Sequence, residues 1–320
     1  MQVDQDTRAL LDELEAATAA SDLPPPWERP VDDVRSDFMA LSKSLAGPGP
    51  QVLKVENREI AGPDGRTIPI RIYWPKEADA GEPLPVMAYY HGSGFVVLGL
   101  DSHDAVCRGL CVESGAIIVA AQYCKAPEHK FPAPVDDAWA ALGWVTENCA
   151  ALGADPARIS VGGDSAGANL ATVVAQRARA AGAPALACQL LVYPVCEMEF
   201  AQPSYDTFAE GYNLTRDMMF WFRDLYLRDE ADRTNPEAAP ASAADLSGLP
   251  PAVVVAAECD VLVDEGAAYA DRLRAAGVSV DYQLHPGQIH GFWGFHERLP
   301  RSAQAHAEAG AALRRIFGAA

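Results

Sequence analysis

Short strand-like segments, most of them apolar, alternate with segments of helical spacing from residue 85 to the end of the chain. The strand-like segments are 85–91, 116–123, 158–163, 187–194, 252–258 and 279–285, and the helical patterns fall near 102–114, 134–152, 167–181, 264–276 and 300–317. Apolar strands that alternate with helices are typical of a parallel sheet covered by helices on both faces. The sequence therefore predicts an α/β fold with a mostly parallel central sheet.

Two parts of the sequence do not follow this alternation. Apolar residues at helical spacing predict helices near 3–20 and 31–46, and the segment 197–240 is aromatic and helical without a strand pattern. A helical excursion between two sheet strands is expected to form a lid, which the N-terminal helices join. We therefore expect N-terminal cap helices in 1–48, a cap insertion in 197–240, and a main α/β domain built from 49–196 and 241–320.

The charge balance excludes several classes of partner. The 320 residues carry a net charge of −19, from 25 basic and 44 acidic side chains. Such a chain repels phosphate backbones and anionic lipid, so neither nucleic acid nor a membrane is expected as a partner. The seven cysteines form no C-x-x-C pair, and the acidic N-terminus lacks the features of a secretory signal. These features favour reduced thiols, a cytoplasmic location and no metal site.

A G-x-S-x-G pattern occupies 163–167, where a buried strand is expected to end and a helix to begin. A serine on such a turn is exposed at the carboxyl end of the strand, as nucleophiles of α/β enzymes are. Ser165 is therefore the candidate nucleophile. Gly163 and Gly167 are expected to permit the turn, and Asp164 is expected to be structural. The alternative is a capped turn that contains a serine by chance.

A serine nucleophile requires a base, and the segment LHPGQIHGF offers His285 and His290. His285 falls at the end of a strand pattern. His290 follows a glycine-containing loop and precedes Gly291, which makes it the more exposed and mobile candidate. We therefore predict that His290 is the base.

The imidazole in turn requires a carboxylate that fixes its tautomer. Asp260 comes directly after the apolar segment 252–258, at the expected edge of the sheet. The other candidates of the same loop are Glu258, Asp264 and Glu265. The last two fall in the first turn of the following helix, where acidic residues meet the helix dipole favourably. Asp260 is thus the predicted partner, and Ser165, Asp260 and His290 occur in the order found in α/β-hydrolases.

Stabilisation of an oxyanion requires N–H donors next to the nucleophile. The segment 89–98, YYHGSGFVVL, follows a buried strand, and its small residues allow backbone N–H groups to face a ligand. Ser93, Gly94 and Ala166 are the candidate donors. His91 is expected to pin this loop through a hydrogen bond, next to Gly92.

These motifs together resemble the hormone-sensitive-lipase-like esterases, bacterial family IV of the α/β-hydrolases. The resemblance covers about 50–317 and rests on HGSGF at 91–95, YCKAPEHKFPA at 123–133, GDSAG at 163–167, D-x-L-x-D-E-G at 260–266 and IHGF at 289–292. It implies a helical cap and hydrolysis of carboxylic esters without metal or cofactor. It also implies Ser165 as nucleophile, Asp260 as orienting carboxylate and His290 as base, with Ser93, Gly94 and Ala166 as the oxyanion hole.

The sequence departs from the family pattern at several positions. Ser93 stands where the family has the middle glycine of its HGGG-type loop, so a side chain is added that could narrow the acyl pocket or bind substrate. A positive φ at this position would also become costlier. Gln122 and Cys124 replace a paired acidic and basic residue before Ala-Pro-Glu, so both charges are absent together, and Val261 replaces a proline.

The expected reaction is hydrolysis of uncharged, short- to medium-acyl esters through an acyl-enzyme. Two alternatives stay open: a non-catalytic small-molecule receptor of the same fold, and an amidase or lactonase with the same residues. A homodimer is a further possibility that the resemblance implies. Aromatic candidates for the substrate pocket are Phe95, Tyr193, Phe208, Tyr212 and Phe220; those in the lid could instead pack the cap onto the core.

Overall fold

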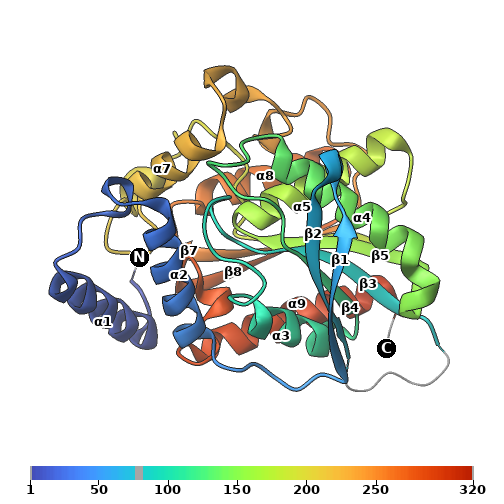
Figure 1. Cartoon of the computed structure of the whole chain (residues 1–320), viewed down its shortest axis with the longest axis horizontal. Coiled ribbons are helices and arrows are strands. Elements are labelled where there is room, and N and C mark those ends of the chain that lie inside the picture. Colours follow the sequence, from blue (N-terminus) through green and yellow to red (C-terminus); the bar gives the residue numbers. More distant parts are fainter. Residues whose placement is uncertain (1, 76–81, 319–320) are drawn as a thin grey trace.

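The computed structural model describes residues 2–75 and 82–318 and is built around an eight-stranded sheet (Figure 1). The strand order is β1-β2-β4-β3-β5-β6-β7-β8. The strands are β1 (Lys54–Ala61), β2 (Thr67–Trp74), β3 (Leu84–Tyr90), β4 (Ile117–Ala121), β5 (Ala154–Asp164), β6 (Cys188–Val192), β7 (Ala252–Cys259) and β8 (Val280–Ile289). The first two strands and β4 pair in antiparallel fashion, and the others pair in parallel. The predicted mostly parallel sheet is confirmed.

The central strands are apolar on both sides because each side meets a separate hydrophobic cluster. In β3, Val86, Ala88 and Tyr90 belong to one cluster. Met87 and Tyr89 point to the opposite face and belong to the other. Successive strand side chains alternate between the two faces, so a strand covered on both faces becomes continuously apolar.

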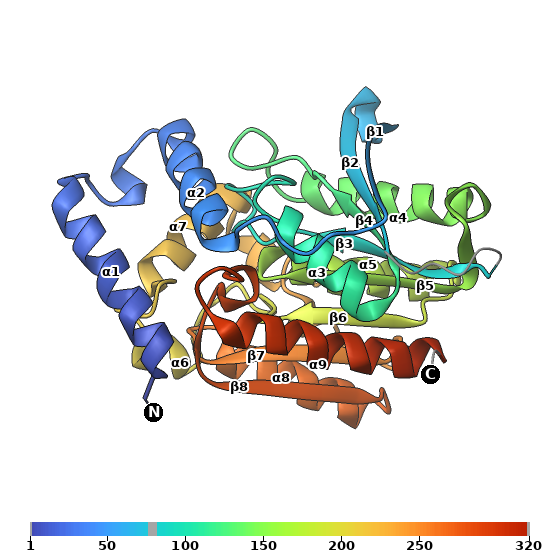
Figure 2. The same cartoon turned by 90° about the horizontal axis from the view of Figure 1, so that it is seen from below.

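Helices cover both faces of the sheet (Figure 2). On one face α3 (Asp104–Ser114) packs against α9 (Pro300–Phe317). The other face carries α4 (Ala133–Leu152), α5 (Ala166–Ala181) and α8 (Val263–Ala275), whose buried residues join the first cluster. This layered arrangement leaves the carboxyl ends of the parallel strands as the place where loops meet.

A cap lies beside these strand ends. It combines α1 (Gln5–Ser21) and α2 (Val31–Ala46) with α6 (Ser204–Thr207) and α7 (Arg216–Tyr226). The helices α2 and α7 are neighbours in both views (Figures 1 and 2). Single 3₁₀ turns occur at Pro26–Glu28, Pro63–Gly65, Glu230–Thr234, Pro240–Ser242 and Phe292–Gly294. The segment 197–240 contains no strand in the structure described, as its sequence predicts. The assignment of the cap as a separate domain stays a prediction.

No helix in the described ranges 2–75 and 82–318 is both long enough and apolar enough to cross a membrane.

Candidate active site

Ser165 lies at the sharp turn between β5 and α5. Its backbone has φ 55° and ψ −121°, a conformation that L-residues rarely adopt. Gly167 approaches β3 so closely that a Cβ there would overlap the carbonyl oxygen of Tyr90, and a Cβ on Gly163 would collide with the backbone of Gly167. Both glycines are therefore required by close backbone approach, because strand and helix meet at this turn without room for side chains.

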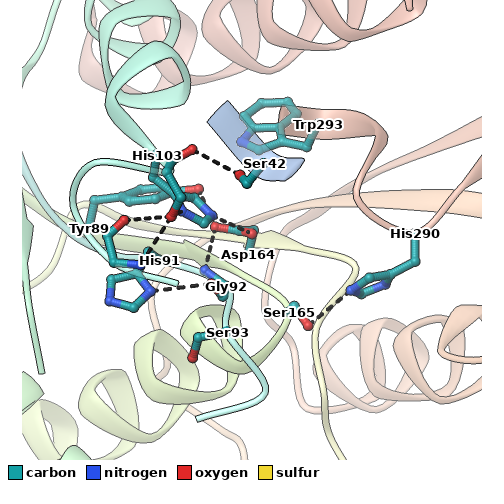
Figure 3. Close-up of polar contacts among 12 residues, drawn as sticks. Ser42, Tyr89, His91, Gly92, Ser93, His103, Asp164, Ser165, His290 and Trp293 are labelled. Atoms are coloured by element: carbon teal, nitrogen blue, oxygen red, sulfur yellow. Dashed lines mark hydrogen bonds and ion pairs between the residues drawn. The ribbon is translucent and has the colours of Figure 1, made fainter. Parts of the chain in front are cut away.

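His290 and Asp260 meet Ser165 at the same edge of the sheet. The Nε2 atom of His290 lies 3.0 Å from Ser165 Oγ, and its Nδ1 atom lies 2.7 Å from Asp260 Oδ2. Figure 3 shows the imidazole pointing at the serine from the loop after β8. Asp260 follows β7, is 1% exposed, and accepts a second hydrogen bond from the Leu262 N–H at 3.0 Å. The three side chains thus form one hydrogen-bonded row across the ends of β5, β7 and β8.

The other candidates lie elsewhere. His285 is inside β8, which extends to Ile289, and its Nε2 atom lies 3.8 Å from Glu308 Oε2 instead of facing the serine. Asp264 accepts the N–H of Ser204 at 2.8 Å and so holds the start of α6. Glu258 accepts the Gly287 N–H at 2.8 Å and supports the end of β8, just before His290. None of these groups contacts Ser165.

The candidate oxyanion donors come from two elements next to Ser165, the loop after β3 and the start of α5. None of the hydrogen bonds between described residues uses the N–H of Ser93, Gly94 or Ala166. Ala166 begins α5, so the positive end of that helix dipole faces the same space. Gly94 has φ 55°, and a Cβ there would collide with the Phe222 ring of α7. The arrangement leaves backbone donors available for an anionic oxygen beside Ser165.

Asp164 joins the turn at Ser165 to the loop after β3. Its Oδ1 atom accepts hydrogen bonds from the Tyr89 hydroxyl at 2.8 Å and the Gly92 N–H at 2.9 Å, and its Oδ2 atom lies 3.2 Å from His103 Nε2 (Figure 3). Burial raises the pKa of this carboxyl, but His103 and the two hydrogen bonds outweigh it, so the pKa lies below its ordinary value. The buried Asp164 carboxylate therefore links the two segments through its hydrogen bonds.

His91 lies at the start of the same loop. Its Nδ1 atom is 3.2 Å from the carbonyl oxygen of Gly92, and its ring stacks on Tyr123 with the centroids 4.4 Å apart. Burial lowers its pKa to about 3, so the ring is neutral at physiological pH. A Cβ on Gly92 would overlap the Asp164 carboxylate, which explains the glycine at that position.

The loop that carries His290 is held by residues of the cap. Asn213, between α6 and α7, donates its side-chain amide to the His290 carbonyl oxygen at 2.9 Å. Gln288 hydrogen-bonds to Asp4 and Thr7 at the start of α1. Sequence reasoning missed these contacts, and it also missed His103. Each joins segments that are far apart in the sequence and carries no spacing signal of its own.

A cavity of about 700 Å³ extends from Ser165 into the cap, and most of its wall is apolar. Its wall includes Phe95 and Tyr193, as predicted. The prediction for Phe208, Tyr212 and Phe220 is corrected, since none of them belongs to the wall among the described residues. The wall side chains that α7 contributes, Met218, Met219, Phe222 and Arg223, share one helical face, and Phe220 instead lies against Phe200 and Arg223.

The N-terminal helices supply a second part of this wall. Leu11, Leu14, Phe38 and Leu41 of α1 and α2 line the cavity, together with Trp27 of the turn between them. The sequence predicts these helices as part of the cap, but their pocket residues carry no signal that distinguishes them from core residues. Leu41 is 42% exposed, which places it at the rim.

Glu265 of α8 is a buried acid that hydrogen-bonds to the segment that follows β6. Its Oε1 atom accepts the Cys196 N–H at 2.6 Å, and its Oε2 atom accepts the Tyr205 hydroxyl at 2.9 Å. Burial raises its pKa to about 8, although these hydrogen bonds oppose the shift. The folded protein therefore keeps this carboxyl protonated at neutral pH.

This raised pKa makes the stability of the protein pH-dependent. Above pH 4.5 the unfolded chain releases the Glu265 proton while the folded protein retains it until about pH 8, so the free energy of unfolding falls as pH rises. Between pH 6.5 and 8 we expect Glu265 to lower it by about 2 kcal/mol, and Glu265→Gln to remove this decrease. Urea unfolding at both pH values measures it. Glu199 is exposed, so Glu199→Gln is the control, and its free energy of unfolding should fall between pH 6.5 and 8 as much as that of the wild type. If the free energy of unfolding of Glu265→Gln fell equally, the prediction would be wrong.

No group of three or more His, Cys, Asp or Glu side chains that could hold a metal ion occurs in residues 2–75 and 82–318.

Comparisons with known proteins agree with this architecture. The family described as the alpha/beta hydrolase fold matches residues 87–294. Carboxylesterase NlhH of Mycobacterium tuberculosis is 46% identical over 271 residues, which cover 83% of this chain and 84% of that protein. The ethyl acetate hydrolase of Pseudomonas putida is 36% identical over 295 residues, which cover 91% of this chain and 92% of that protein.

A solved structure gives the same result across nearly the whole chain. The ester-hydrolase EH1AB1 from the metagenome of Lake Arreo, complexed with a derivative of bipyridine phosphonate, superposes with a TM-score of 0.95 at 40% identity. The match covers 99% of this chain and 100% of that chain. Fold, motifs and sequence identity thus point to one family: the chain belongs to the hormone-sensitive-lipase-like family IV of the α/β-hydrolase fold.

Proposed function

We propose that this chain is a serine carboxylesterase that hydrolyses uncharged short- to medium-acyl esters through an acyl-enzyme. The observation that carries the proposal is the row Ser165–His290–Asp260, with contacts of 3.0 and 2.7 Å, at the floor of an apolar cavity. The ester-hydrolysing relatives support the reaction class.

In the first half of the reaction Ser165 Oγ attacks the ester carbonyl carbon while its proton passes to His290 Nε2. Asp260 accepts the Nδ1–H, fixes the tautomer that leaves Nε2 free to take the proton, and stabilises the imidazolium. The carbonyl oxygen becomes an oxyanion and accepts hydrogen bonds from the N–H groups of Ser93, Gly94 and Ala166. When the tetrahedral intermediate collapses, His290 returns the proton to the leaving alcohol and the acyl group stays on Ser165.

In the second half water takes the place of the alcohol. His290 accepts a proton from the water as its oxygen attacks the acyl carbon, the same N–H groups hold the oxyanion, and Ser165 Oγ leaves with the proton from His290. The products are the carboxylic acid and the free enzyme. With one water molecule as co-reactant, these residues are sufficient for atoms and charges to balance.

The cavity wall supports the substrate class. Its apolar residues offer burial to acyl and alcohol chains, at about 25 cal/mol for each Å² of apolar surface removed from water. The net charge of −19 works against anionic substrates. An uncharged ester that fits within about 700 Å³ meets both conditions.

A burst experiment tests the proposal. Rapid mixing of the enzyme with p-nitrophenyl esters of increasing acyl length should release up to one equivalent of nitrophenol before steady turnover wherever deacylation limits the rate. A fluorophosphonate probe should add one mass increment on the peptide that contains Ser165 and abolish turnover. Matched anilides and lactones establish the leaving-group preference. Tight ligand binding without turnover or labelling would favour a receptor, and labelling of another residue would overturn the nucleophile assignment.

The N-terminal helices are expected to shape acyl preference. Leu41→Ala removes apolar contact at the cavity rim, so kcat/KM for an octanoyl ester should fall about 5-fold, which corresponds to about 1 kcal/mol of lost burial. The acetyl ester, too short to reach the rim, should be unaffected. Leu53→Ala is the control, since Leu53 is 61% exposed and lies outside the cavity wall. Equal loss on both esters would argue against this role of the cap.

A further inference from the structure

A chain of hydrogen bonds runs behind the loop that carries the candidate oxyanion donors. The N–H of Phe95 donates to Ser93 Oγ at 2.9 Å, Ser93 Oγ lies 2.5 Å from the hydroxyl of Tyr123, and that hydroxyl donates to the carbonyl oxygen of His91 at 2.6 Å. Tyr123 has a single hydroxyl proton, which His91 receives, so Ser93 must be the donor in the middle contact. The direction of the chain is therefore set from Phe95 to His91.

These hydrogen bonds fix both ends of the segment 92–94, which carries the candidate oxyanion donors. His91 and Phe95 flank Gly92, Ser93 and Gly94, and Tyr123 reaches them from the end of the neighbouring strand β4. Ser93 and Tyr123 are 4% and 1% exposed, so water cannot readily replace either partner. The His91 ring stacks on Tyr123 and closes the cluster on one side.

The backbone of this segment needs such support. Gly94 and Phe95 have φ of 55° and 63°, and for Phe95 this left-handed conformation is strained. The Phe95 N–H, which the Ser93 hydroxyl accepts, is fixed in that orientation. Ser93 itself does not have a positive φ, so the strain that a side chain at this position threatened does not arise.

The position of Ser93 in the sequence suggested that its side chain narrows the acyl pocket or binds substrate. The structure gives its hydroxyl a different role. This hydroxyl points away from Ser165 (Figure 3) and is engaged with Tyr123 and Phe95, so it is not free to bind a substrate. The backbone N–H of Ser93 makes no hydrogen bond within the described residues, while its side chain anchors the loop. The family's glycine could make neither contact.

We propose that Ser93 and Tyr123 are positioning residues that hold the oxyanion loop in its donor geometry, with Ser93 taking over a function that the family's middle glycine cannot perform. This inference rests on the proposed function, because it concerns the transition state of the same reaction. It predicts that the pair acts on the developing oxyanion and leaves ground-state binding nearly unchanged.

The test compares Ser93→Ala, Tyr123→Phe and the double variant with two matched controls. Ser160→Ala and Tyr90→Phe each remove a buried hydroxyl that donates to a backbone carbonyl, of Val86 at 3.0 Å and of Ala138 at 2.8 Å, and neither hydroxyl bonds to residues 91–95. Each single variant should lower kcat about 10-fold on p-nitrophenyl butyrate and change KM less than 2-fold. The inhibition constant of an alkyl trifluoromethyl ketone, whose adduct carries an oxyanion, should rise by the same factor. The controls should keep kcat within 2-fold.

The double variant supplies the second criterion. Because both residues act in one chain of contacts, its kcat should fall about 10-fold and not about 100-fold. Thermal melts of all variants identify any that are unfolded at the assay temperature. Three results would each overturn the proposal. They are a loss of kcat no greater than in the controls, an effect on KM alone, and a loss of kcat in the double variant equal to the product of the two single losses. Failure of the fluorophosphonate to label Ser165 in the wild-type enzyme would instead overturn the proposed function.

Discussion

Asp260→Asn is expected to lower kcat by about 10⁴-fold while leaving the fold intact. Asp260 Oδ2 lies 2.7 Å from His290 Nδ1 and holds the proton on that nitrogen, which keeps Nε2 free to accept from Ser165. An asparagine can present its amide N–H there and favour the opposite tautomer, in which Nε2 carries the proton and cannot act as a base. Steady-state kinetics on a short-acyl nitrophenyl ester measure the loss, and circular dichroism verifies the fold.

Asp264→Asn provides the matched control. It changes an aspartate four residues away, whose carboxylate accepts from Ser204 and does not contact His290. Its kcat should stay within about 3-fold of wild type. If Asp264→Asn lost activity and Asp260→Asn retained it, the orienting carboxylate would have been misassigned.

Gly167→Ala is expected to prevent folding or to lower the free energy of unfolding by at least about 3 kcal/mol. The added Cβ would overlap the carbonyl oxygen of Tyr90, which belongs to strand β3 and cannot move without shifting the sheet. Soluble yield and urea unfolding measure the effect. Because the steric conflict lies at the junction of strand and helix, a larger residue should be tolerated no better.

Gly143→Ala is the control for Gly167→Ala. Gly143 also lies within a helix, α4, but a Cβ there would meet nothing within 4 Å. Alanine has the higher helix propensity, so this variant should be as stable as wild type or more stable by up to about 1 kcal/mol. A Gly167→Ala protein with the stability of Gly143→Ala would show that the close approach does not constrain the turn.

The sequence predicted those features that depend on local pattern. Strand and helix alternation indicated the sheet and its covering layers, because a strand buried on both faces must be apolar throughout. Parallel strands place their carboxyl ends at one edge of the sheet, so the residues that directly follow these strands lie close together. This rule made it possible to identify Ser165, Asp260 and His290 as candidates. The structure brings these three together and leaves His285 and Asp264 apart.

Features that depend on contacts between distant segments could not be predicted. Tyr123 stood in a family motif, yet no spacing rule reveals that its hydroxyl meets Ser93, which lies 30 residues earlier in the chain. Phe220 was assigned to the pocket by residue type, whereas the rotation of α7 turns Phe222 toward Gly94 and Phe220 toward Phe200. Aromatic content indicates that a helix packs against something, but only the placed backbone decides which face lines a cavity.

The backbone at Ser165 has a consequence for how this protein evolves. Its φ of 55° with ψ of −121° costs on the order of 1–3 kcal/mol for a residue with a Cβ, and glycine would adopt it with little strain. A glycine at this position would relieve the backbone strain, but it could not carry out the proposed reaction. Selection for stability alone would remove the proposed nucleophile, so substitutions that stabilise the protein and keep the proposed activity must arise elsewhere in the chain.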